Sequence, residues 1–207
     1  MFIRTESFSQ YIRQYPVVTT LITLNVVIFL LTLLPVIGDR IFIAGLGANS
    51  LIEQGEYWRL VTPMFLHAGF MHLLFNMFSL FIFGPELEKV SGKARFLTVY
   101  FLSGIFGCIA TFFVYDSNFT HVGASGAIFG IFGAFGALVY YTKRMLPQLR
   151  QIILPIIGLG VVMTFIGPNI NAAAHIAGLI VGFLIGLSFF HPKRIISWRK
   201  PKAVPKR

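Results

Sequence analysis

A serine and a histidine stand in two short polar strings inside apolar segments, and both side-chain types could do chemistry there. Ser125 lies in the string GASG (residues 123–126), and His175 lies in AHIAG (residues 174–178). Ionisable groups at membrane depth usually serve a function, because they are costly to desolvate. A serine hydroxyl becomes a nucleophile when a neighbouring base takes its proton, and histidine is the usual base. The two residues therefore predict a hydrolase whose active site lies inside the membrane.

His72 and Asn76 form a second polar pair, four residues apart, so they share one face of a helix. Both can donate hydrogen bonds toward one point, as an oxyanion hole requires. We expect Ser125 in the first turn of its own helix, where free backbone N–H groups favour the same negative charge. Purely structural interpretations stay open. Ser125 could form a hydrogen bond to the backbone of its own helix, and His72 or Asn76 could form an interhelical hydrogen bond.

A metal site is the main chemical alternative, since His67, His72 and His175 could act as ligands. No carboxylate or cysteine accompanies them, and the chain lacks the HExxH motif. We therefore expect no metal and no other cofactor. No acidic residue falls within an expected span, so Asp116, in a loop, is the only remote candidate to orient the histidine. The arrangement expected is a dyad.

The elements that must position these residues are membrane helices. Of the 207 residues, 56% are hydrophobic and 12% charged, against about a quarter charged in a soluble domain. Segments of about 20 apolar residues can cross the hydrocarbon core. Six are expected, at 17–37, 68–84, 96–115, 122–141, 152–167 and 172–190. The predicted fold class is an all-α polytopic membrane protein with one domain (17–190), between an N-terminal tail (1–16) and a basic C-terminal tail (191–207), with a long outer loop at 38–67.

The net charge of +10 follows this topology. With the N-terminus inside, 15 of the 17 Lys and Arg fall on one side, and only Arg40 and Arg59 on the other. This is the positive-inside pattern, which predicts that both termini are cytoplasmic. The basic C-terminal tail directly follows a span, so we expect it to contact anionic lipid headgroups rather than nucleic acid.

The same topology places the polar residues at one depth. Spans 68–84, 122–141 and 172–190 all begin at the outer face, with Ser125 and His175 each about 5 Å below the start of their helices. Small residues every four positions let membrane helices approach closely. They occur on two of these spans, at Gly126 and Gly130 and at Ala174, Gly178, Gly182 and Gly186. Packing along these stripes would bring Ser125 and His175 within hydrogen-bond distance.

Together these residues closely resemble the rhomboid family of intramembrane serine proteases over residues 17–190. The features that match are GASG (the family's GxSG), AHIAG (AHxxG), the His72 to Asn76 spacing (HxxxN) and Trp58-Arg59 in the first outer loop. GxSG alone is weak, because soluble hydrolases carry it too. The resemblance implies that Ser125 would be the nucleophile and His175 the base. It further implies an oxyanion hole formed by His72, Asn76 and the Ser125 N–H, with His67 and Phe129 as supporting groups. Structural positions would be Trp58, Arg59, Gly123, Gly126 and Gly178.

The resulting prediction is an intramembrane serine endopeptidase that cuts transmembrane segments of other proteins, in a plasma membrane and of bacterial type. Span 152–167 is short and contains Pro155, Gly158 and Gly160, so it is the expected gate for lateral entry. A transporter would show polar residues along a whole path, whereas the inner halves of the polar spans are almost wholly apolar. The alternative kept open is a non-catalytic rhomboid-like protein that binds client transmembrane helices.

Overall fold

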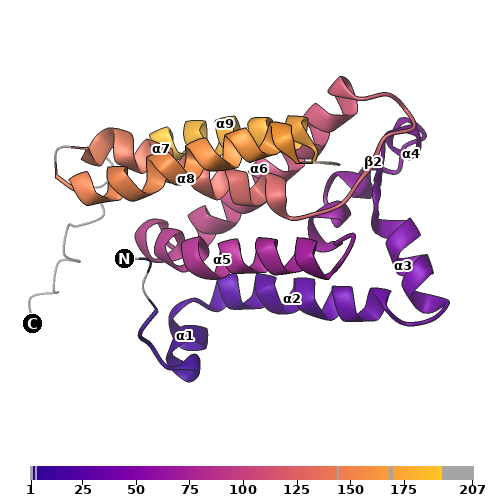
Figure 1. The fold of residues 1–207 in the computed structure, drawn as a ribbon, viewed down its shortest axis with the longest axis horizontal. Helices are drawn as coiled ribbons and strands as arrows, with labels where there is room; N and C mark the ends of the chain where they lie inside the picture. The colour runs from indigo at the N-terminus through magenta and orange to yellow at the C-terminus, as the bar shows by residue number, and fades with distance from the viewer. Residues whose placement is uncertain (1, 3, 144, 168–169, 193–207) are drawn as a thin grey trace, which may run out of the picture.

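The computed structural model describes residues 2, 4–143, 145–167 and 170–192, and helices dominate this part of the chain. Figure 1 shows long helices running side by side, with the short elements α3, α4 and β2 at one end of the bundle and α1 near the other. In chain order the elements are α1 (Phe8–Gln14), α2 (Pro16–Thr32), α3 (Ile37–Gly45), β1 (Gly47–Ala48), α4 (Asn49–Glu53), the 3-10 helices η1 (Tyr57–Leu60) and η2 (Thr62–Phe65), α5 (Phe70–Ser91), α6 (Lys93–Val114), β2 (Thr120–His121), α7 (Ser125–Thr142), α8 (Pro147–Ile166) and α9 (Ala172–Phe189).

Five helices, α5 to α9, are long and apolar enough to cross a membrane. A sixth span results if α1 and α2, which meet at a bend of 109°, count as one. Within the described residues the chain is thus a helical membrane protein with five or six candidate spans. The number six and the cytoplasmic side of the termini stay predictions.

The N-terminal segment, expected as a tail over residues 1–16, contains helix α1. Ser7 caps this helix, and its side chain and that of Gln10 form a reciprocal capping box. Tyr11 lies against α5, where its hydroxyl donates to the Phe81 carbonyl oxygen at 3.2 Å and the two rings stack. Pro16 at the first position of α2 lacks an N–H and fixes the new helix start after the bend.

The bounds of several helices differ from the sequence predictions, among them those of α2, α5 and α8. Helix α2 ends at Thr32 rather than at residue 37, because Pro35 and Val36, which has a positive φ of 64°, interrupt it. Helix α5 continues past residue 84, through Pro85, to Ser91. Helix α8 starts at Pro147 and contains Pro155, so this span is not short as predicted. Proline inside a membrane helix is tolerated where neighbouring groups satisfy the freed carbonyl.

Helix α7 forms the centre of the bundle. Of its most apolar 18 residues, 72% are buried, against 17% for α8. Helix α7 packs on α5, α6, α8 and α9, and Figure 1 shows α7, α8 and α9 running alongside each other. The central helix is therefore enclosed by its neighbours, whereas α8 leaves most of its residues exposed.

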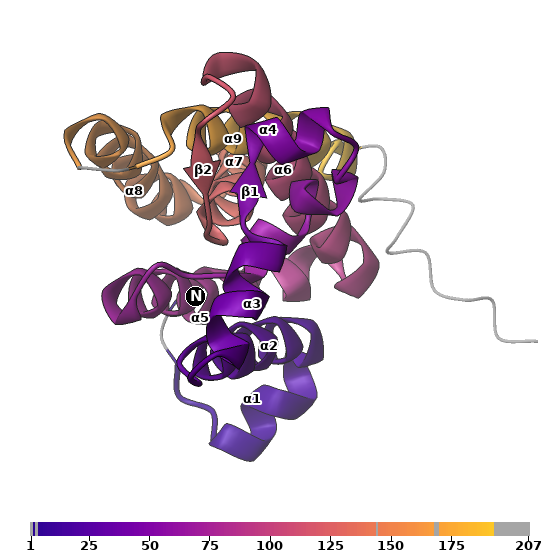
Figure 2. The ribbon, with the colours of Figure 1, turned by 90° about the vertical axis from the view of Figure 1, so that its right-hand side faces the viewer.

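The segment 38–67, expected as a long outer loop, is an ordered cap rather than an open connection. It contains α3, β1, α4, η1 and η2, and β1 pairs antiparallel with β2, with Gly47 opposite His121. Figure 2 shows the two strands side by side at the end of the bundle. Since β2 lies four residues before Ser125, this pairing ties the cap to the start of α7.

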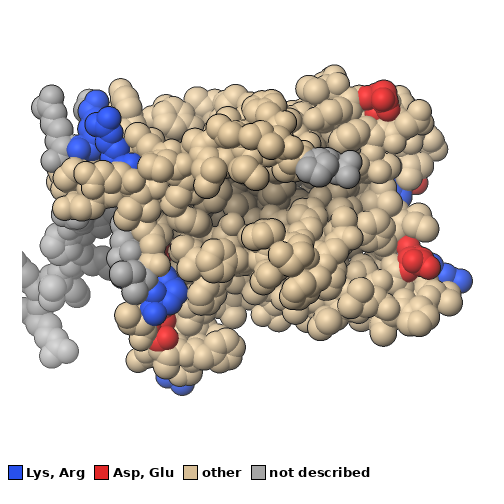
Figure 3. Space-filling view, in the orientation of Figure 1, with Lys and Arg blue, Asp and Glu red and all other residues tan. Residues whose placement is uncertain are grey.

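Charged side chains lie near the two ends of the bundle on the face that Figure 3 shows, and the broad area between them carries no charge. An uncharged band with charged ends suits a helix bundle whose middle contacts lipid. The basic tail expected to contact headgroups was predicted at 191–207, and all of its Lys and Arg lie at 193–207, outside the described residues.

Candidate active site

Gly123 determines where the serine helix begins. Its φ of +127° is a left-handed conformation that side chains disfavour, so the helix cannot start at residue 122 as predicted. The Gly123 N–H donates to the Pro63 carbonyl oxygen at 2.8 Å. A Cβ on Gly123 would lie 2.7 Å from the imidazole of His72. Ser125 is therefore the first residue of α7, about one turn shallower in its helix than expected.

Close approach of α7 and α9 brings the serine and the histidine together. A Cβ on Gly178 would clash with the Gly126 carbonyl oxygen, and the predicted small-residue stripes thus meet. His175 lies one turn before Gly178, and its Nε2 is 2.7 Å from Ser125 Oγ. The imidazole is buried, with 8% of the residue exposed. The structure therefore places the two residues as a hydrogen-bonded pair across the α7–α9 contact.

Two further residues fix the plane and direction of the His175 ring. Phe129, one turn after the serine on α7, stacks on it with centroids 4.1 Å apart and an interplanar angle of 14°. Thr164 on α8 places its Oγ1 2.9 Å from His175 Nδ1. Asp116, the remote candidate for this position, instead accepts the N–H of Asn118 in its own loop at 2.9 Å. Asp116 therefore does not orient the histidine, because the ring's second nitrogen already has a hydroxyl partner.

His72 and Asn76 share a groove with the pair. The groove is lined by α5 on one side, by α7 on the other and by the segment around β2, and it includes Ser125 and His175. Asn76 is buried, and its amide nitrogen donates to the His72 carbonyl oxygen of its own helix at 3.0 Å. One N–H of that amide remains for a ligand in the groove. The His72 ring edge lies against Gly123, directly before the serine helix.

His67 stands behind His72 and is not bonded to the pair. The two rings lie edge to face, with centroids 5.0 Å apart, and 2% of His67 is exposed. Neither of its ring nitrogens has a hydrogen-bond partner among the described residues. Burial lowers the pKa of His67 to about 3, with a smaller contribution from His72. His67 is therefore a neutral packing group beside the groove.

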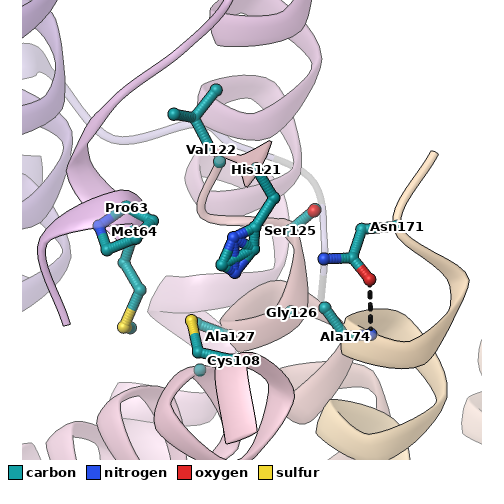
Figure 4. Close-up of a pocket in the computed structure, with 12 residues that line it drawn as sticks. Pro63, Met64, Cys108, His121, Val122, Ser125, Gly126, Ala127, Asn171 and Ala174 are labelled. Atoms are coloured by element: carbon teal, nitrogen blue, oxygen red, sulfur yellow. Dashed lines mark hydrogen bonds between the residues drawn. The ribbon is translucent and has the colours of Figure 1, made fainter. Parts of the chain in front are cut away.

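A small pocket on the other side of the serine contains a residue that the sequence prediction missed. Figure 4 shows the His121 ring pointing into it, between Pro63 and Met64 on one side and Ser125 on the other. Both His121 nitrogens lack partners in the described structure, and burial lowers the pKa of His121 to about 4. Its position depends on the pairing of β2 with β1, which no local pattern around residue 121 indicates.

Trp58 and Arg59 hold the cap together rather than touching the serine. Trp58 Nε1 donates to the Ala44 carbonyl oxygen at 3.2 Å. The Arg59 guanidinium donates to the carbonyl oxygens of Ile43 and Leu46, at 2.8 and 2.6 Å. These carbonyls lie at the end of α3, where helices leave them unpaired. Both side chains thus close the helix that begins the cap.

Comparison with known proteins places this arrangement in a family. Residues 54–192, more than half of the chain, match the Rhomboid domain. The chain belongs to the rhomboid family. The rhomboid protein YdcA of Bacillus subtilis, named as a protease, is 47% identical over 189 residues, which cover 89% of this chain and 94% of YdcA.

More distant rhomboids match the same region. The rhomboid protease GluP of Bacillus subtilis is 40% identical over 152 residues, or 72% of this chain and 29% of GluP. Rhomboid-like protease 1 of Toxoplasma gondii is 34% identical over 165 residues, or 76% of this chain and 56% of that protein. The rhomboid region is thus shared with longer proteins.

Proposed function

We propose that this rhomboid is an intramembrane serine endopeptidase that acts through Ser125 and His175. The observation that carries the proposal is the 2.7 Å contact between Ser125 Oγ and His175 Nε2, at the start of two apolar helices. The names given to YdcA and GluP, which both contain the words rhomboid protease, support the reaction class. No carboxylate partner is part of the proposal.

In the acylation step, Ser125 Oγ attacks the carbonyl carbon of the scissile peptide while its proton moves to His175 Nε2. The tetrahedral intermediate collapses when that proton passes to the amide nitrogen, and the amine product leaves. Ser125 then carries an ester of the acyl product. A water molecule attacks this ester and gives a proton to His175 Nε2, which passes it to Ser125 Oγ as the ester bond breaks, so the carboxylic acid product leaves and the serine hydroxyl reforms.

The oxyanion of the intermediate needs hydrogen-bond donors that are in place before the reaction. The backbone N–H of Ser125 is one, because the first N–H groups of a helix have no partner within that helix. His72 and the free N–H of Asn76 border the same groove and would complete the set. The His67 ring packs edge to face against His72, and the Phe129 ring on α7 stacks on the His175 ring and holds its orientation.

The substrate that fits this location is the transmembrane segment of another protein. A helical segment keeps its peptide carbonyls in hydrogen bonds, so it must unwind locally before Ser125 can attack. Segments with small or helix-weakening residues should be cut preferentially for that reason. The apolar walls of the groove, such as Phe75 on α5 and Phe132 on α7, suit such a substrate. The expected location is a bacterial plasma membrane, with the basic tail at anionic headgroups and no metal, cofactor or nucleic acid required.

Cleavage in proteoliposomes tests the proposal. A reporter protein with one transmembrane segment is reconstituted with wild type, Ser125→Ala or His175→Ala, and its fragments are followed by gel and mass spectrometry. We expect cleavage within or near the segment by wild type only. A reporter that binds wild type but stays intact would replace this proposal with the client-binding alternative.

A further inference from the structure

The contact between Thr164 and His175 determines which ring nitrogen of the histidine carries the proton. Thr164 is 4% exposed, and its Oγ1 donates to the Gly160 carbonyl oxygen, one turn earlier on α8, at 2.8 Å. A hydroxyl has one hydrogen and two acceptor lone pairs. When the hydroxyl hydrogen points to the Gly160 carbonyl, Thr164 Oγ1 accepts at its 2.9 Å contact with His175 Nδ1.

This orientation of the hydroxyl is compatible with one assignment of protons on a neutral ring. Nδ1 must carry the hydrogen, and Nε2 must present its lone pair, which faces Ser125 Oγ at 2.7 Å. That lone pair is what a general base needs to take the serine proton. In serine proteases with a triad, a third group bonded to the Nδ1–H holds the same tautomer and orientation.

We propose that Thr164 is a positioning residue that holds His175 as the Nδ1–H tautomer; this rests on the proposed function of Ser125 and His175. The group is a neutral hydroxyl from α8, which contains no Asp or Glu. A neutral acceptor suits an apolar span, where an ionised carboxylate is expensive. The chain of hydrogen bonds thus runs from the Gly160 carbonyl through Thr164 and His175 to Ser125.

Because Thr164 belongs to α8, the position of this helix also affects the orientation of His175. The buried residues of this helix are Leu149, Ile153 and Thr164, so it contacts the bundle along a narrow stripe. A displacement of α8 that separated Thr164 Oγ1 from His175 Nδ1 would release the tautomer. The readiness of the base therefore depends on the least buried of the candidate spans.

Nuclear magnetic resonance of the ring nitrogens tests the tautomer directly and does not require activity. The protein is labelled with ¹⁵N histidine in detergent, at a pH where the ring is neutral, and the His175 signals are assigned by their loss in His175→Ala. We expect the Nδ1–H form to dominate in wild type and in Thr164→Ser. Thr164→Val, which keeps the shape but removes the hydroxyl, should shift the ring toward the Nε2–H form. A wild-type ring that is mainly Nε2–H overturns the proposal, whether or not the protein cleaves peptides.

Labelling rates with a serine-directed fluorophosphonate give the second readout. Thr164→Val should lower the rate about 10-fold, since one buried hydrogen bond is lost, and Thr164→Ser should restore it. The matched control is Thr142→Val, because Thr142 makes the same bond to the carbonyl one turn earlier but lies at the far end of α7. A Thr164→Val protein that keeps the wild-type rate while Ser125→Ala is unlabelled rejects the role of Thr164 and leaves the proposed function standing.

Discussion

Replacing Gly178 by alanine should separate the serine from the histidine without touching either. The added Cβ would lie 2.9 Å from the Gly126 carbonyl carbon and closer still to its oxygen. Carbon and oxygen atoms in contact need about 3.3 Å, so α7 and α9 must move apart by about 1 Å. Both partners at this contact are backbone atoms, so no side chain can rotate to make room.

The size of the effect follows from the distance between the two reacting side chains. His175 lies one turn from Gly178 on the same helix, so the same movement would lengthen the 2.7 Å contact of its Nε2 with Ser125 Oγ beyond hydrogen-bond range. A misplacement of about 1 Å in a catalytic arrangement can lower the rate about 10²-fold. We expect a loss of this size in fluorophosphonate labelling, together with a destabilisation of about 1–3 kcal/mol from overpacking.

A second glycine provides the control for this experiment. Gly158 lies on α8, and a Cβ there would meet no other atom within 4 Å. Gly158→Ala should therefore label at the wild-type rate and unfold at the same or a slightly higher temperature. Wild-type labelling by a folded Gly178→Ala protein would show that the close approach of α7 and α9 does not set the geometry of the pair.

Three further outcomes are expected. Asn76→Ala should cleave a transmembrane reporter about 10²–10³-fold more slowly yet detectably, as for loss of one oxyanion donor, and an unchanged rate would remove Asn76 from the oxyanion hole. His67 and His121 have lowered pKa values in the fold, so the unfolded chain binds more protons below pH 6.5. The free energy of unfolding should therefore fall by about 1 kcal/mol per histidine as the pH drops from 7.5 to 5.5, which lowers the thermal midpoint, and His121→Gln should flatten that fall. Crosslinking α7 to α8 through cysteines at Gly136 and Ile157, which adjoin each other, should suppress reporter cleavage but not fluorophosphonate labelling, and unchanged cleavage would reject α8 as the gate.

The sequence predicted the approach of Ser125 to His175 because the information is local and periodic. Glycines four residues apart on two spans indicated close packing; Ser125 directly precedes Gly126, and His175 lies one turn before Gly178. The start of α7 was less accurate, since the positive φ at Gly123 goes with contacts to other segments of the chain. The capping box at Ser7 and Gln10 was a readable sign of α1 that the description of a polar tail passed over.

Thr164 and His121 were missed for a different physical reason. A threonine in an apolar helix commonly bonds to its own backbone, so its residue type gives no sign of a partner on another span. Its contact with His175 depends on how α8 and α9 are aligned, and the contact of His121 with the serine pocket depends on pairing across more than 70 residues of chain. Neither the alignment of α8 with α9 nor the pairing of β1 with β2 is indicated by a local pattern in a single sequence.

The central claim is that Ser125 is an activated nucleophile and His175 its base. Fluorophosphonate labelling of the purified protein, followed by mass spectrometry of its peptides, tests this most directly. The account predicts one adduct, on Ser125, in wild type, and no adduct in Ser125→Ala or His175→Ala proteins that remain folded. An unlabelled wild type, or labelling that persists in His175→Ala at the wild-type rate, would contradict it.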